Sequence, residues 1–99
     1  MVGYVYIAHN YETGVTKIGK GANPRRRVKT FEGFVLIDQY DVGHSSTAIS
    51  LEQVILKILK PFLVYGKEWF ILPERTNLKR TFDMLLIKGS GILTSREFK

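Results

Sequence analysis

The pattern of apolar and polar residues predicts that the chain begins with a β-hairpin. Residues 3–9 (GYVYIAH) alternate in character and are rich in β-branched and aromatic side chains, which favours a strand. Residues 10–14 (NYETG) have turn-forming side chains at both ends, and residues 15–19 predict the returning strand.

Further along the chain, helical spacing of apolar residues alternates with short extended runs. The expected elements are a helix at residues 23–31, a strand at 34–42, a helix at 45–60, a short strand at 68–72 and a helix at 75–88. Asn23 and Pro24 should begin the first helix. N-caps for the second are offered by Ser45, Ser46 and Thr47. The sequence thus predicts an α+β domain: a small antiparallel sheet, starting with the hairpin and flanked by about three helices, in the order ββαβαβα.

A length of 99 residues leaves room for one domain with one core. We expect residues 1–88 to form this single domain. The Gly89-Ser90-Gly91 run should then release a short C-terminal tail at residues 89–99.

The hairpin should divide its side chains between two faces, because neighbouring residues of a strand point in opposite directions. With an even number of residues in the connecting loop, one face carries Tyr4, Tyr6, Ala8, Lys17 and Gly19, and the other carries Val5, Ile7, Thr16 and Ile18. The second face is largely apolar and should face the core, while the first should display phenols and an amine. An odd loop would place Tyr6 and Lys17 on opposite faces.

The charge distribution favours a polyanionic partner. The formal net charge is +6 and the sequence pI is about 9.7. Six of the fifteen lysines and arginines lie between Lys17 and Lys29, with no acidic residue among them. This clustering makes nucleic acid, with DNA favoured, the expected partner.

The absence of cysteine excludes disulfides and thiolate metal sites, and it fits a reducing compartment. No apolar run approaches the ~18–20 residues of a membrane span, and the N-terminus lacks the layout of a signal peptide. We therefore expect no membrane partner and an intracellular location, in the cytoplasm or nucleus of a host cell.

One of three consecutive arginines in the first expected helix is set apart by helical spacing. Arg27 lies three residues after Pro24 and four before Phe31, so it borders the stripe that faces the core. An arginine held there is placed for bidentate contact with a phosphate. The other expected nucleic-acid-binding residues are Lys20, Arg25, Arg26, Lys29 and Tyr4.

Short motifs in this order resemble the GIY-YIG nuclease superfamily. They are Gly3-Tyr4-Val5-Tyr6, Lys17-Ile18-Gly19, Arg27 eight residues after Gly19, and Glu52 early in a later helix. The likeness is greatest to compact variants of phages and large DNA viruses, whose second motif reads Lys-Ile-Gly and in which a segment like Glu68-Trp69-Phe70 also follows. It covers residues 3 to 72.

The resemblance implies a GIY-YIG-like fold and a catalytic role for four residues. Tyr6 matches the tyrosine near the attacking water, and Lys17 stands where many members have a second tyrosine. Arg27 matches the phosphate-binding arginine and Glu52 the metal-binding glutamate.

Two positions depart from the pattern that the resemblance implies. Phe31 stands where some members carry a histidine one turn after the arginine. The asparagine that others carry late in the domain has no clear counterpart, although Asn77 is available.

These groups suit metal-dependent hydrolysis of a phosphodiester. Mg²⁺, for which Mn²⁺ should substitute, binds proteins through as few as one carboxylate, so Glu52 alone would hold it. The Lys17 ammonium should lower the pKa of Tyr6 and make it the base that activates water. Arg27 would neutralise charge at the phosphorus, and the products would carry 5′-phosphate and 3′-hydroxyl ends.

Two other functions stay open. Each of these residues alone has an ordinary structural explanation, and the same basic face would serve a nucleic-acid-binding module that does not cleave, or a subunit of a larger nucleoprotein assembly. A mere binder has no need of Glu52, which repels phosphate unless a metal intervenes. A protein partner or a homodimer would supply targeting in so small a domain.

Five further side chains receive no catalytic role from the sequence. Glu68 is expected to pair with a basic neighbour, while Trp69 and Phe70 anchor the core. His9 and His44 lack the spacing of metal ligands.

Overall fold

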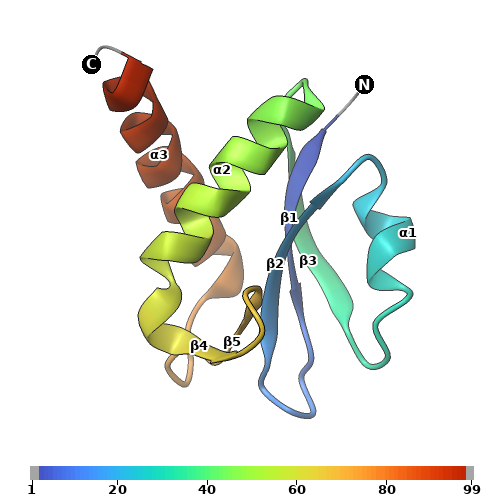
Figure 1. Cartoon of the computed structure of the whole chain (residues 1–99). Coiled ribbons are helices and arrows are strands. Elements are labelled where there is room, and N and C mark those ends of the chain that lie inside the picture. Colours follow the sequence, from blue (N-terminus) through green and yellow to red (C-terminus); the bar gives the residue numbers. More distant parts are fainter. Residues whose placement is uncertain (1–2, 98–99) are drawn as a thin grey trace.

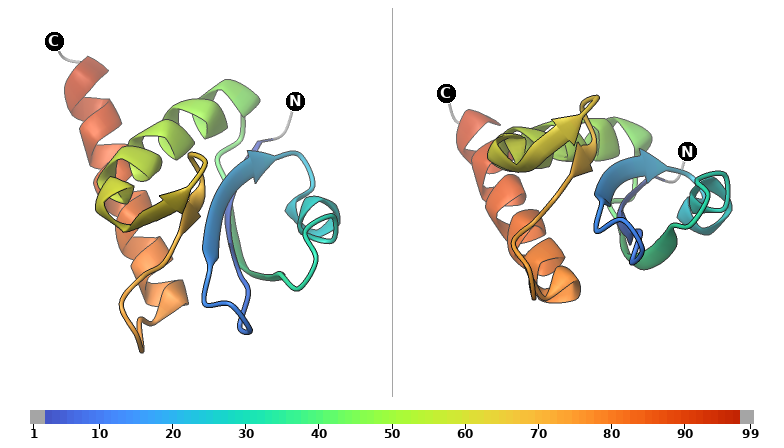
Figure 2. Two further views of the ribbon diagram at one scale, coloured as in Figure 1. Left: turned by 60° about the horizontal axis from the view of Figure 1, so that its bottom comes forward. Right: turned by 90° about the horizontal axis from the view of Figure 1, so that it is seen from below.

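The computed structural model describes residues 3–97, with side chains up to residue 94. It has three layers, in which a five-stranded antiparallel sheet separates helix α1 from helices α2 and α3 (Figure 1). The view from below in Figure 2 shows the same separation. The expected α+β class and antiparallel sheet are confirmed.

The elements occur in the order ββαβαββα. They are β1 (Tyr4–His9), β2 (Thr16–Gly21), α1 (Pro24–Val28), β3 (Val35–Asp41), α2 (Ser45–Ile58), the 3-10 turn η1 (Lys60–Phe62), β4 (Leu63–Tyr65), β5 (Trp69–Phe70) and α3 (Leu78–Glu97). The strands lie in the sheet in the order β3-β1-β2-β5-β4. Strand β4 was not expected, because its residues are exposed and do not alternate in burial.

The register of the first hairpin is the one expected for an even loop, and its faces divide accordingly. Tyr6 pairs with Gly19, and Ala8 pairs with Lys17, across a loop of residues 10–15. Val5, Ile7 and Ile18 accordingly lie together in the main core, which α2 and α3 complete from the same side of the sheet. Burying an apolar side chain of this size stabilises the fold by roughly 1.5–3 kcal/mol.

The opposite face of the hairpin is not displayed to solvent, contrary to expectation. Tyr6 is only 1% exposed and Lys17 only 3%. Helix α1 covers this face through Val28, which forms a second, smaller core with Tyr6 and Ala8.

The expected C-terminal tail is instead helical as far as the structure describes it. Helix α3 continues through Gly89 and Gly91 to Glu97. A Cβ built on Gly89 would lie 2.8 Å from Leu51 Cδ1, and Leu93 packs on the main core. Glycine at residue 89 therefore allows α3 to approach α2 closely, and tertiary packing overrides the poor helix propensity of the Gly-Ser-Gly run. Residues 98–99 of the predicted tail lie outside the described residues.

Three helix boundaries differ from those predicted. Helix α1 ends at Val28 rather than Phe31. Helix α2 is capped by His44, whose Nδ1 accepts a hydrogen bond from the Ser46 backbone N–H at 3.2 Å. Helix α3 begins three residues later than expected, after Arg75 adopts a left-handed φ of 66°. Within the described residues, no helix is long and apolar enough to cross a membrane.

Candidate active site

The predicted site residues gather around the end of β2, where the sheet is incomplete. Strand β5 pairs with β2 only at Thr16 and Lys17, and one more backbone bond joins the Ile18 N–H to the Glu68 carbonyl at 3.2 Å. In the described part of the chain, Gly19–Gly21 has β1 as its sole strand neighbour. This part of β2 is thus an edge that side chains can reach from both faces of the sheet.

Two small hollows meet at this edge. One, of about 250 Å³, lies on the α2 side and is lined by Gly3, Lys20, Gly21, Ala22, Ser45, Ala48 and Ile49. The other, of about 290 Å³, lies on the α1 side and is lined by Gly21, Ala22, Asn23, Arg26, Arg27 and Thr30. Because both share Gly21 and Ala22, a ligand at the end of β2 would reach lysine on one side and arginine on the other.

Tyr6 lies across β2 above its partner Gly19. A Cβ built on Gly19 would fall 2.3 Å from both the hydroxyl oxygen and Cζ of Tyr6. The glycine of the Lys17-Ile18-Gly19 run therefore provides the space that the phenol occupies. The hydroxyl is held beside the open edge of β2 instead of projecting freely into water.

The surroundings of Tyr6 make its phenol harder to ionise. Burial raises the pKa of Tyr6 to about 12, and the Glu68 and Glu52 carboxylates add to this effect. Arg27 opposes it through its charge and a side-chain hydrogen bond. The expectation that Lys17 lowers this pKa is wrong, because burial dominates.

Arg27 contacts the site even though much of its side chain is in water. Its guanidinium interacts with Tyr6, and Arg27 Cζ lies 5.3 Å from the centroid of the Phe31 ring. The buried residues of α1 are Pro24 and Val28, and Arg27 directly precedes Val28. Arg27 therefore borders the covered face of α1 and retains a guanidinium edge that solvent and a phosphate can reach.

Lys17 is held in a cage of one carboxylate and three aromatic rings. Lys17 Nζ lies 2.5 Å from Glu68 Oε2. It also lies 4.9 Å from the ring centroid of Trp69, 5.0 Å from that of Phe31 and 5.9 Å from that of Tyr6. The expected pairing of Glu68 with a basic neighbour is confirmed, and this pair satisfies the buried ammonium.

Glu52 reaches the same edge from α2 and is 4% exposed. Its Oε1 lies 3.8 Å from Lys20 Nζ, while Oε2 is buried and has no hydrogen-bond partner. Burial raises the pKa of Glu52, and the Glu68 carboxylate adds to the rise. The positive charges of Lys20 and, to a smaller extent, Lys17 lower this pKa. A buried carboxylate oxygen without a partner is costly unless a ligand satisfies it.

The predicted nucleic-acid-binding residues divide between the edge and α1. Lys20 lies at the edge beside Glu52. Arg25, Arg26 and Lys29 are exposed along α1, where Lys29 is the C-cap. Tyr4 is half-buried opposite Gly21. All five are thus next to the end of β2 or on the helix that follows it.

Sequence reasoning missed the part that Glu68 plays in the electrostatics of the site. It contributes to the raised pKa of both Tyr6 and Glu52, and it neutralises Lys17. The signal was its position directly before Trp69, which places it beside Lys17 once β5 pairs with β2. Among the described residues, no group of three or more histidines, cysteines or acids is arranged to hold a metal.

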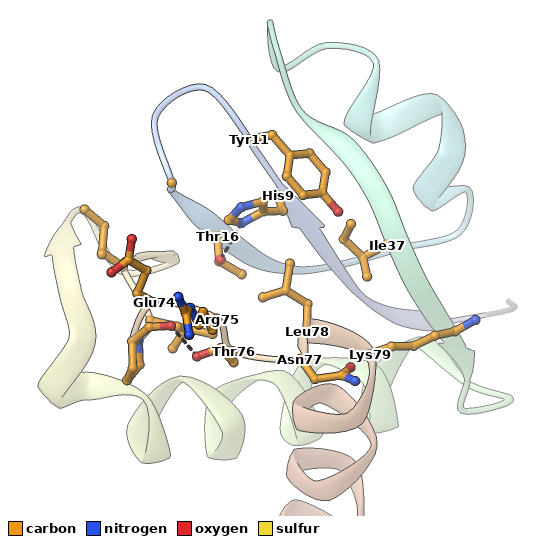
Figure 3. A pocket seen from close by; sticks show the side chains of 14 residues that line it. His9, Tyr11, Thr16, Ile37, Glu74, Arg75, Thr76, Asn77, Leu78 and Lys79 are labelled. Carbon is orange, nitrogen blue, oxygen red and sulfur yellow. Dashed lines mark hydrogen bonds between the residues drawn. The ribbon is translucent and has the colours of Figure 1, made fainter.

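A larger hollow of the described structure lies elsewhere. It has a volume of about 720 Å³ and is lined by His9, Tyr11 and Thr16 of the hairpin and by the loop that leads into α3 (Figure 3). His9 Nδ1 and Thr16 Oγ1 lie 2.9 Å apart, and burial lowers the pKa of His9. None of the four predicted catalytic residues lines it, so we place the candidate active site at the edge of β2.

One family of known proteins matches the chain. The model of the T5orf172 domain matches residues 3–85, which include every residue of the edge described above. No curated protein and no solved structure matches the chain. The match covers most of the sequence, and the chain therefore belongs to the T5orf172 domain family, which is associated with phage nucleases and with DNA binding.

Proposed function

We propose that the protein is a metal-dependent endonuclease of the GIY-YIG type that hydrolyses phosphodiester bonds of DNA. The observation that supports it most directly is Glu52. Its Oε2 is buried without a partner, yet it lies in a region that also contains Lys20, Lys17 and Glu68. A module that only binds nucleic acid gains nothing from a desolvated carboxylate beside its cations.

The residues present fit a divalent cation of the magnesium class. Glu52 offers an unpartnered carboxylate oxygen, and Mg²⁺ takes one or two protein carboxylates while keeping waters and substrate phosphate as its other ligands. Mg²⁺, or Mn²⁺ in its place, would stabilise the departing 3′-oxygen and the charge on the phosphate. Glu68 is engaged by Lys17 and is not needed as a ligand.

The cations of the edge bind and orient the phosphate. Arg27 interacts with Tyr6 and keeps part of its guanidinium in solvent. With this exposed part it donates two parallel hydrogen bonds to phosphate oxygens. Lys20, now 3.8 Å from Glu52, would contact the neighbouring phosphate and leave Glu52 free to hold the metal. The positive charges of Arg25, Arg26 and Lys29 attract the DNA backbone on either side of the cleaved phosphate.

Tyr6 holds the attacking water in line with the leaving oxygen. With a pKa of about 12, the phenol keeps its proton at neutral pH, so Tyr6 orients the attacking water by hydrogen bonding. As the water oxygen forms its bond to phosphorus, one water proton passes to solvent, the bond to the 3′-oxygen breaks, and this oxygen takes up a proton from solvent. The products are a 5′-phosphate and a 3′-hydroxyl.

A cleavage assay tests this function. Supercoiled plasmid, single-stranded DNA and branched DNA are incubated with Mg²⁺, Mn²⁺ or EDTA, using the native chain, Glu52→Gln and the exposed control Glu32→Gln. We expect metal-dependent nicking that Glu52→Gln lowers by at least ~10²-fold, as for removal of a group that stabilises the transition state. Binding by anisotropy should survive in both variants.

A binding module without cleavage is the alternative that the basic surface of α1 supports. It predicts binding that depends on Lys20, Arg25 and Arg26 and that is unaffected by Glu52→Gln or Tyr6→Phe. If the native chain cleaves DNA in none of the conditions but binds it in this way, the binding module replaces the nuclease as the proposed function. In either case we propose that targeting comes from a protein partner or a homodimer, and that the protein acts in a reducing compartment inside a host cell.

A further inference from the structure

Four aromatic side chains form a cluster beside the proposed catalytic centre. Tyr65 stacks on Trp69, with ring centroids 5.6 Å apart and planes 20° apart. Phe31 and Phe34 meet the Trp69 ring edge-on at 5.4 and 5.3 Å. We call these four residues the aromatic cluster.

The outer ring of this cluster is available to a ligand. Tyr65 is 55% exposed, although one side of its ring lies against Trp69. Trp69 and the two phenylalanines are half-buried, so the expectation that Trp69 anchors the core is only partly met. Phe70, which is 0% exposed, does anchor it.

The backbone fixes Tyr65 and Trp69 as a pair. They are partners across the short β4–β5 hairpin, and the turn between them contains Gly66 at a φ of 60°. A Cβ on Gly66 would lie 3.0 Å from Trp69 Cδ1, so the turn closes tightly against the indole ring. A preformed ring pair loses little conformational entropy when it binds a flat ligand.

The cluster shares its members with the cations of the active site. Lys17 Nζ lies 4.9 Å from the Trp69 centroid, and both Lys17 Nζ and Arg27 Cζ lie within 5.3 Å of the Phe31 centroid. A phosphate held by Arg27 thus lies next to rings that can stack on a base. Base-paired nucleotides cannot offer a ring face, because both faces of each base are already stacked.

From this juxtaposition we propose that the aromatic cluster binds an unpaired nucleobase next to the phosphate that is cleaved, with Tyr65 as the stacking surface. The substrate would then be DNA with a single-stranded nucleotide at the site, such as a flap, a branch or a single strand. This inference rests on the proposed function for its position, and it names the substrate class of that site.

The test measures base stacking apart from cleavage. A short single-stranded DNA carries fluorescent 2-aminopurine at its centre, and a matched strand carries an abasic nucleotide there. Binding is measured by anisotropy, and stacking by quenching of 2-aminopurine, both in EDTA. The variants are Tyr65→Ala, Tyr65→Phe, which keeps the ring, and Tyr40→Ala. Tyr40 is 49% exposed on β3 and lies outside the aromatic cluster.

We expect quenching by the native chain, and a loss of affinity of ~5–150-fold in Tyr65→Ala for the strand that carries the base. The affinity of Tyr65→Ala for the abasic strand should fall much less. Tyr65→Phe and Tyr40→Ala should bind both strands with the affinity of the native chain. Equal losses on both strands, unchanged affinity in Tyr65→Ala, or no quenching by the native chain would each overturn the proposal.

Cleavage separates this proposal from the proposed function. A flapped duplex and a fully paired duplex of the same sequence are compared in Mg²⁺. If the native chain cuts both equally and Tyr65→Ala changes neither, the stacking site is wrong while the nuclease stands. If nothing is cut but quenching depends on Tyr65, the nuclease is wrong while the stacking site stands.

Discussion

The Tyr6 hydroxyl occupies the space that a side chain at Gly19 would need. A Cβ on Gly19 would lie 2.3 Å from that oxygen, and Gly19 belongs to the strand edge that forms the candidate active site. Tyr6 itself is 1% exposed, so it has no free direction in which to move. One backbone position thus couples the packing of the fold to the placement of a catalytic group.

Gly19→Ala should therefore cost both stability and activity. Overpacking of this kind destabilises by about 1–3 kcal/mol. Gly21→Ala is the matched control on the same strand, because a Cβ there meets nothing within 4 Å. Urea denaturation of the two variants measures the difference, and equal stability of both would contradict the packing that we describe.

Glu52→Gln should raise the stability of the protein at neutral pH. Burial raises the pKa of Glu52, so the folded state binds more protons than the unfolded state above the ordinary value of 4.5, and stability falls as pH rises through this interval. The glutamine side chain is neutral at every pH, so Glu52→Gln does not lose stability over this interval. Lys20, which would lose its partner, is 38% exposed and can be solvated.

Thermal melts at several pH values measure this effect. The gain of Glu52→Gln over the native chain should shrink as pH falls below 4.5, where the carboxyl is protonated in both states. Mg²⁺ should raise the melting temperature of the native chain and of Glu32→Gln, but not that of Glu52→Gln. A melting temperature of Glu52→Gln below that of the native chain at pH 7 would contradict the prediction.

The pair formed by Lys17 and Glu68 should respond asymmetrically to mutation. The Lys17 side chain is 4% exposed and that of Glu68 is 36% exposed. Glu68→Gln leaves a buried ammonium without its carboxylate, whereas Lys17→Met leaves a carboxylate that water can reach and puts an apolar chain among aromatic rings. Glu68→Gln should thus lose more stability, by roughly 1–3 kcal/mol. Urea denaturation ranks the variants, and the reverse order would show that the pair is solvated in solution.

Tyr6 should ionise only at unusually high pH. Its pKa of about 12 lies above the ordinary 10.0, so between these values the folded state retains a proton that the unfolded state loses, and stability falls with rising pH. Absorbance of phenolate during alkaline titration should show a late component that is absent in Tyr6→Phe. Stability of Tyr6→Phe should depend less on pH over that interval. Retention of the late component in Tyr6→Phe would assign it to another tyrosine.

The sequence was sufficient to predict the hairpin, but it left the register open between an even and an odd loop; the observed loop of residues 10–15 is even. An even loop and alternating residues place Tyr6, Lys17 and Gly19 on one face, as observed. The burial of Tyr6 depends instead on α1, a helix of only five residues whose position is set by the turns around it. The pKa of Tyr6 was therefore predicted in the wrong direction, since its main cause is a tertiary contact.

Strand β4 and the C-terminal half of α3 escaped prediction for a related reason. Leu63–Tyr65 is exposed throughout, so its strand conformation is set by pairing with β5 and leaves no alternation in the sequence. The Gly-Ser-Gly run has poor helix propensity, which predicted the end of the helix. The helix nevertheless continues, because residue 89 packs so closely on Leu51 that only a residue without a side chain fits there. In both places the conformation depends on a contact with a segment that is not adjacent in the sequence: β5 for β4, and α2 for α3.

Two glycines of α3 allow this explanation to be tested. Alanine is more favourable than glycine within a helix by about 0.5–1 kcal/mol. A Cβ on Gly91 meets nothing within 4 Å, so Gly91→Ala should gain this stability in full. A Cβ on Gly89 would press on Leu51 Cδ1 at 2.8 Å, and Leu51 is 2% exposed, so Gly89→Ala should gain nothing or lose stability. Thermal melts compare the pair, and if residues 89–99 were a released tail instead, neither substitution would change the melting temperature.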